Sequence, residues 1–134
     1  MGQYDHLHLT VVQKPEILVQ INAAFQKAVG DPNMQVTYGA PTVIYVSCKN
    51  EDEEIVKGCN AGVVMENMLL EAADLGLGAV YLFGVSQVLF ANEEITKLLQ
   101  IPEGFRTVSA IAVGTSDALQ ERTLGTDKIS TTTL

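Results

Sequence analysis

Residues 55–84 read IVKGCNAGVVMENMLLEAADLGLGAVYLFG, and the rest of the chain is organised around this stretch. We placed residues 55–75 on a helical wheel that advances about 100° per residue. Four polar residues fall in one narrow stripe: Asn60, Asn67, Glu71 and Asp74. The rest of the circumference is almost entirely apolar, which is typical of a buried helix. Gly76-Leu77-Gly78 then forms a turn into an apolar strand over 79–83.

The central helix predicts the oligomeric state. One subunit of 134 residues would struggle to cover a helix that is apolar nearly all round. Soluble monomers seldom expose large apolar patches. We therefore expect a homodimer that packs through the central helix 55–75.

The composition indicates one globular domain over residues 1–134, because 47% of the residues are hydrophobic and 18% are charged. A net charge of −8 argues against nucleic acid, whose binders carry a basic surface. No run approaches the roughly 20 apolar residues of a membrane span, and the N-terminus lacks a signal-peptide pattern. Cys48 and Cys59 stand outside any metal-binding or disulfide spacing. We expect a cytoplasmic protein with no nucleic-acid or membrane partner.

Strands and helices alternate along the chain. Three further segments are short and rich in β-branched residues, as strands are: 7–12, 41–48 and 108–114. Helical patterns mark three others: 15–30, 86–90 and 92–99. The polar residues 115–134 are expected to form a C-terminal arm, either disordered or held by another subunit. The alternation predicts an α/β or α+β layered domain with one sheet flanked by helices, and it leaves the strand order open.

Motifs outside the central stretch carry little chemistry. His6 and His8 share a face of the first strand by its period of two. With Asp5 they could begin a metal site, but no further ligand follows at a suitable spacing. We interpret the acidic residues 50–54 as a solvated helix start, favoured by the helix dipole. The glycine turn 76–78 follows a helix instead of opening one, so it is not a dinucleotide-binding fingerprint.

The segment Glu66–Gly78 resembles the hallmark of the nitroreductase family, which reads roughly Q-N-M-x-L-A-A-x-x-L-G-L-G. Three further stretches are similar to family motifs in the same order: Leu9–Gln13, Ala40–Ile44 and Ile101–Gly104, the last followed by a strand that ends at Gly114. The resemblance covers most of residues 3–123. It implies an α+β fold of the three-layer α/β/α type, with a mixed sheet of about four strands and a long buried central helix.

The resemblance also implies an activity. Nitroreductases are intertwined homodimers that hold two FMN molecules in the subunit interface. NAD(P)H delivers hydride to the flavin N5, and a small acceptor such as a nitro compound or a quinone then takes the electrons. The cofactor carries this chemistry, so no catalytic side chain and no metal ligand is expected.

Carried over residue by residue, Tyr81-Leu82-Phe83-Gly84 is similar to the segment that lies along the flavin ring. The Gly84 N–H is the expected donor towards flavin N5, because a residue without Cβ permits close backbone approach. Gln3 is similar to the family's glutamine at the polar edge of the flavin, and Arg122 falls near a basic position that meets the phosphate. Tyr81 and Phe83 could instead be ordinary core aromatics, and Arg122 a solvated tail residue.

The chain departs from the family at its start. Family members begin with a helix bearing an R-x-S-x-R-like motif, and the resemblance therefore implies a chain that is N-terminally truncated relative to them. Its arginines are Arg106 and Arg122. Losing two charge-assisted phosphate contacts at roughly 1.5–3 kcal/mol each would weaken FMN affinity by several orders of magnitude. The alternative function is therefore a non-catalytic dimeric domain that has lost tight FMN binding and acts as a binding or assembly module.

Overall fold

A computed structural model describes residues 4–84, 88, 92–117 and 129–133. The described elements follow one another along the chain as η1 (Tyr4–His6), β1 (Leu7–Val12), α1 (Pro15–Val29), β2 (Thr42–Lys49), α2 (Glu54–Asp74), β3 (Gly78–Tyr81), α4 (Glu93–Leu98) and β4 (Phe105–Gly114). No helix within the described residues combines the length and apolarity that crossing a membrane requires.

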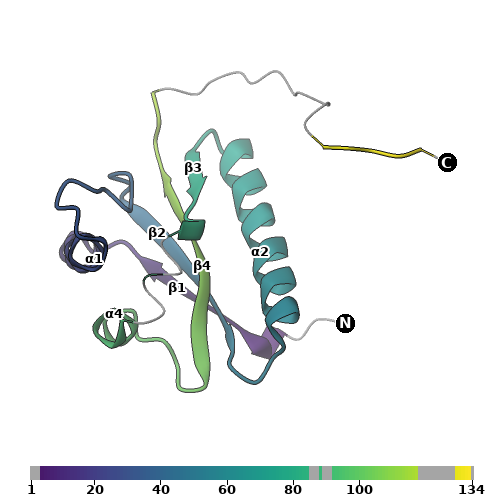
Figure 1. Cartoon of the computed structure of the whole chain (residues 1–134). Coiled ribbons are helices and arrows are strands. Elements are labelled where there is room, and N and C mark those ends of the chain that lie inside the picture. The colour runs from purple at the N-terminus through teal and green to yellow at the C-terminus, as the bar shows by residue number, and fades with distance from the viewer. Residues whose placement is uncertain (1–3, 85–87, 89–91, 118–128, 134) are drawn as a thin grey trace.

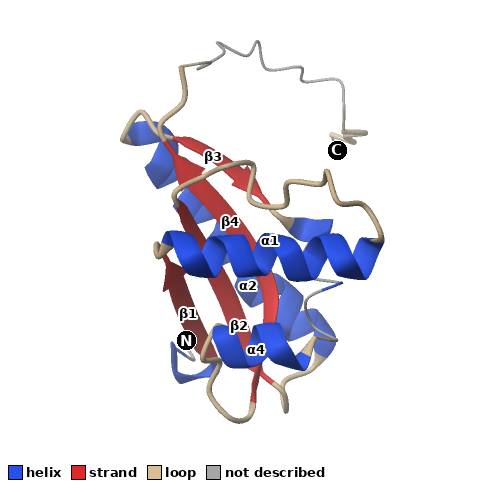
Figure 2. Cartoon of the chain, turned by 90° about the vertical axis from the view of Figure 1, so that its left-hand side faces the viewer, coloured by secondary structure: helices blue, strands red, loops and turns tan. Residues whose placement is uncertain are grey.

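The sheet is the middle of three layers. Helices α1 and α4 cover one face and α2 covers the other (Figure 1 and Figure 2). Successive side chains of a strand point to opposite faces, and the two cores follow this rule. Val43, Tyr45 and Ala110 pack on the α1 and α4 side, whereas Val46 and Ile111 pack against α2. The predicted three-layer α/β/α arrangement is confirmed.

The strand order is β1-β2-β4-β3, and all three neighbouring pairs are antiparallel. The prediction of a mixed sheet is therefore wrong. Two strands of one sheet that are joined by a crossover helix usually run in the same direction. Here α2 connects β2 and β3, which do run in the same direction, but β4 lies between them and pairs antiparallel with both.

Local signals explain where the elements begin and end. Pro15 opens α1, and Gly30 ends it with a left-handed φ of 74°. Asn92 caps α4 by accepting hydrogen bonds from the N–H groups of Glu94 and Ile95. The last strand begins at Phe105, earlier than the expected 108, because Phe105 pairs with Lys49. The predicted helix over 86–90 lies outside the described residues except for Val88.

Within one chain, α2 is buried on one side only. Its inward face carries Ala61, Met65 and Ala72. Its outward face carries large apolar side chains that are well exposed: Ile55 at 71%, Val63 at 64% and Leu70 at 60%. The sheet covers only the side of α2 that faces it, as expected for one subunit of this length, and burial of the outward side stays a prediction.

Candidate functional site

The segment Tyr81–Gly84 leaves the sheet at its edge. Tyr81 is the last residue of β3 and pairs with Ile111 of β4. The next N–H, that of Leu82, still donates to the carbonyl of Ala110 over 2.8 Å. Phe83 and Gly84 then adopt a helical conformation. The strand thus ends two residues earlier than the expected 79–83.

The two aromatic side chains of this segment face outward. Tyr81 is 41% exposed and Phe83 is 60% exposed. Their ring centroids lie 6.0 Å apart at an interplanar angle of 42°. Leu82, between them, points into the core and is buried. The alternative interpretation of Tyr81 and Phe83 as core aromatics is therefore wrong. Because the Leu82 side chain is buried, only the backbone of Leu82 could contact a ligand.

Gly84 is exposed beside this aromatic pair. A Cβ built on Gly84 would meet no atom within 4 Å, so a ligand can approach its backbone closely. The other two predicted site residues, Gln3 and Arg122, lie outside the described residues. The structure therefore brings together four of the six predicted site residues, as one continuous segment.

A groove of about 820 Å³ runs beside β3, within the size range of small-molecule sites. Its walls are Gly78–Val80 of β3, Leu69, Ala73 and Leu77, the end of β4 with the following residues, and the loop before β2. A Cβ on Gly78 would come within 2.8 Å of Ser116 Cβ, and one on Gly114 within 2.7 Å of Pro41 Cδ. Glycine at these two positions lets the walls of the groove pack together.

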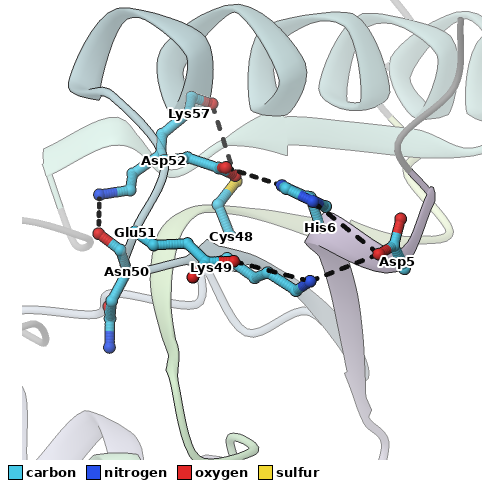
Figure 3. A network of polar contacts seen from close by, with 8 residues as sticks. All are labelled: Asp5, His6, Cys48, Lys49, Asn50, Glu51, Asp52 and Lys57. Atoms are coloured by element: carbon cyan, nitrogen blue, oxygen red, sulfur yellow. Dashed lines mark hydrogen bonds and ion pairs between the residues drawn. The ribbon is translucent and has the colours of Figure 1, made fainter.

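A cluster of polar side chains that the sequence analysis did not predict lies where α2 begins (Figure 3). His6 Nδ1 and Asp52 Oδ1 are 2.7 Å apart. The Asp52 side chain is only 9% exposed, so the acidic run 50–54 is not uniformly solvated. His6 belongs to η1 and not to a strand, so the expected shared face with His8 is wrong. Only the antiparallel pairing of β1 with β2 places these residues together.

The cations at this corner are bound by carboxylates. Buried Lys57 donates to the Asn50 carbonyl over 2.9 Å and to Glu54 Oε1 over 3.1 Å. Arg106 pairs with the other oxygen of Glu54, and Lys49 pairs with Asp5. The bond from Lys57, and next that from Arg106, lowers the pKa of Glu54. These cations are therefore engaged within the chain.

Among the described residues, no group of three or more His, Cys, Asp or Glu side chains is arranged to hold a metal ion. His8 instead makes an edge contact with the Phe105 ring, with centroids 6.2 Å apart. Cys48 is buried and Cys59 is exposed on α2, and both are free thiols. Burial is the main cause that raises the pKa of the Cys48 thiol.

Comparison with known proteins adds to this geometry. The model of the Nitroreductase family matches residues 4–115. The fold is similar to an FMN-bound nitroreductase from Bacteroides fragilis, with a TM-score of 0.78 and 22% identity over 99% of this chain and 80% of that one. An FMN-bound nitroreductase from Desulfitobacterium hafniense gives 0.74 and 21%, over 96% and 77%. The NADPH:FMN oxidoreductase of Vibrio harveyi, complexed with NAD+, gives 0.65 and 16%, over 91% and 56%. No curated protein matches.

Proposed function

This chain belongs to the nitroreductase family, and on that basis we propose that it is an FMN-dependent oxidoreductase. In this proposal NAD(P)H is the electron donor, and a nitro compound, a quinone or a similar small molecule is the acceptor. The FMN and NAD+ complexes of the similar structures support the two nucleotides. When bound, FMN supplies the hydride chemistry, and the protein supplies binding and orientation.

The observation that carries the proposal is the exposed segment Tyr81–Gly84. A flavin ring needs a flat apolar surface and a backbone donor at close range. Tyr81 and Phe83 each offer an exposed aromatic ring, although the two rings are tilted by 42° to one another. Gly84 offers backbone with open space where a side chain would stand. The exposed rings and the open backbone support a flavin ring at this segment. Gln3 at its polar edge and Arg122 at the phosphate remain predictions.

The proposal includes a homodimer formed through α2. The exposed side chains of Ile55, Val63 and Leu70 support it, because they would leave water on association. A partner at this surface would border the groove beside β3, since Leu69 and Ala73 belong to both α2 and the groove wall. The proposal also places the protein in the cytoplasm. The free thiols of Cys48 and Cys59 support this location, because the cytoplasm keeps thiols reduced.

A second candidate is a dimeric module of the same fold that does not bind FMN tightly. The observation that favours it is the state of the cations near the start of α2. Lys57 and Arg106 are both engaged by Glu54, and Lys49 is engaged by Asp5. None of these three is positioned as a ready partner for a doubly charged phosphate.

An FMN titration separates the two candidates. We expect the purified protein to bind FMN at micromolar concentration and its visible flavin absorption to bleach when NAD(P)H is added without oxygen. Phe83→Ala should weaken FMN binding by roughly tenfold, because stacking on an aromatic ring contributes about 1–3 kcal/mol. Val19→Ala, an exposed apolar residue on α1, is the matched control and should leave binding unchanged.

Protein that stays colourless and shows no FMN affinity would reject the oxidoreductase and favour the second candidate. Equal FMN affinities for Phe83→Ala and the wild type would remove Phe83 from the proposed site.

A further inference from the structure

A second groove, of about 560 Å³, lies between α1 and α4 on the face of the sheet opposite α2 (Figure 2). Its volume is within the range of small-molecule sites. Helix α1 contributes Gln20, Ala23, Ala24 and Lys27, which recur at intervals of three and four and so share one face of the helix. The groove shares no lining residue with the groove beside β3 or with the segment Tyr81–Gly84, so it is a separate site.

The floor of this groove is apolar. Ala24 and Leu98 are half-buried and pack against the core between the helices and the sheet. Ala23 is exposed beside them. Because α4 is much shorter than α1 and the side chains at 23 and 24 are small, the two helices leave space between them that a larger side chain would fill. An apolar group of a ligand can occupy that space.

The rim of the groove carries positive charge. Lys27 and Lys97 are exposed and line it. The cations near the start of α2 are bound by carboxylates, whereas no carboxylate among the described residues forms an ion pair with Lys14, Lys27 or Lys97. Two of these three lysines therefore meet at one groove, in a chain whose net charge is −8.

The helix dipole explains only part of this arrangement. Lys27 and Lys97 each lie in the last turn of their helix, where a cation is favoured. The dipole favours that position along the axis but does not select a face of the helix, and both lysines line the groove.

Glu94 limits the charge that the groove can accept. It also lines the groove, one turn before Lys97. With two lysines and one glutamate, the lining residues carry one net positive charge. This charge suits a singly charged carboxylate better than a doubly charged phosphate, which proteins usually bind with arginine.

We propose that this groove binds a small carboxylate that carries an apolar body. In this arrangement the carboxylate meets Lys27 and Lys97, and the apolar body covers Ala23, Ala24 and Leu98. Exposed ion pairs contribute little by themselves, so binding requires both parts of the ligand. The proposal does not rest on the proposed function.

Titration of the isotope-labelled protein with octanoate, followed by amide chemical shifts, tests the site and locates it. We expect saturable shifts at the amides of residues 20–27 and 94–98. Acetate has the charge without the apolar body, and octanol has the apolar body without the charge. Each should bind at least roughly tenfold more weakly than octanoate. Equal binding of either compound would overturn the proposal.

Three variants with the same change of charge test the role of the rim. Lys27→Gln and Lys97→Gln should each weaken octanoate binding roughly threefold, because each removes one exposed charge contact. Lys14→Gln is the matched control: it removes a lysine that has no ion pair among the described residues and does not line the groove. It should leave octanoate binding unchanged. Equal losses for all three would show a general charge effect and overturn the site.

Ala23→Phe tests the floor without changing the charge. The phenyl ring should fill the groove and weaken octanoate binding at least roughly tenfold. Ala28→Phe, at an exposed position of the same helix outside the groove, should bind octanoate like the wild type. Far-UV circular dichroism checks that both variants are folded. Retained binding by Ala23→Phe, or octanoate shifts that are absent or confined to α2, would overturn the proposal.

Discussion

The two long helices lie on opposite faces of the same sheet and meet their surroundings in different ways. Helix α1 buries Leu18, Ile21 and Phe25 against the strands, and charged or amide side chains such as Gln20 and Lys27 lie at its surface. Helix α2 buries Ala61, Met65 and Ala72 and keeps several large apolar side chains exposed, among them Val63 and Leu70. The sheet of the same chain thus covers most of the large apolar side chains of α1 but leaves Ile55, Val63 and Leu70 of α2 exposed.

The contrast between α1 and α2 shows how much of a helix's burial its hydrophobic pattern predicts. A narrow apolar stripe, as on α1, indicates that one neighbouring layer covers the helix. An apolar surface that continues round the helix, as on α2, indicates a second layer. It does not say which side the chain itself covers, because that depends on how the helix is turned on the sheet.

Of the substitutions that compare the two helices, Phe25→Ala should have the largest effect on the free energy of unfolding. Phe25 is buried in the core between α1 and the sheet. Its truncation should lower the free energy of unfolding by about 3–5 kcal/mol. The loss should be the same at all protein concentrations, as measured by urea unfolding, because Phe25 is already buried within its own chain. A loss that shrinks as the protein is concentrated would mean that α1 also lies in an interface.

Leu70→Ser should show the opposite dependence on concentration. Leu70 is 60% exposed in the single subunit, so the stability of a monomer should change by less than about 0.5 kcal/mol. Association should weaken by about 1–3 kcal/mol if the outer face of α2 is covered by a partner. Thermal unfolding at several concentrations measures both quantities. An unchanged dimer affinity would place Leu70 outside the interface.

Asp52→Ala tests how α2 is attached to its own chain. It removes the 2.7 Å contact with His6 Nδ1, in a partly buried site. We expect a loss of about 1–2 kcal/mol in the free energy of unfolding. His6→Ala should cost a similar amount, and the double variant should cost little more than either single one, because both remove the same contact. Fully additive losses would show that the two side chains act independently.

The smallest effect on stability should come from the titration of Glu54. Hydrogen bonds from Lys57 and Arg106 lower the folded-state pKa of Glu54 below its ordinary value of 4.5. The stabilisation is therefore fully present above pH 4.5 and is lost as the pH falls through the lower folded-state pKa. As the pH falls below 4.5, Glu54→Gln should lose less stability than the wild type loses. Above pH 4.5 the curves of stability against pH should have nearly the same shape for the two proteins. Parallel acid profiles for the two proteins would contradict the assignment.

Much of the fold was predictable because its signals are local. Pro15 and Gly30 delimit α1, and the β-branched segments predicted β1 and β2 within one or two residues. The position of β4 between β2 and β3 was not predictable, because antiparallel and parallel neighbours leave the same pattern in a buried strand. The start of β4 at Phe105 also depends on its partner strand.

The candidate site was predictable only in part. Resemblance to a family identified Tyr81–Gly84, but the exposure of Tyr81 and Phe83 follows from their place at the sheet edge, which requires the strand order. Asp52 and His6 are 46 residues apart. Neither carries a local signal, so only the register of β1 on β2 reveals their contact.

The place of β4 at the interior of the sheet has a consequence for biosynthesis. When the ribosome has made the chain as far as Tyr81, β2 and β3 have both been synthesised, yet neither has the neighbour that lies between them. Their facing backbone groups can be paired only after Phe105–Gly114 emerges. Because such long-range pairing is slow, the nascent polypeptide carries two open strand edges until nearly the whole domain has left the exit tunnel.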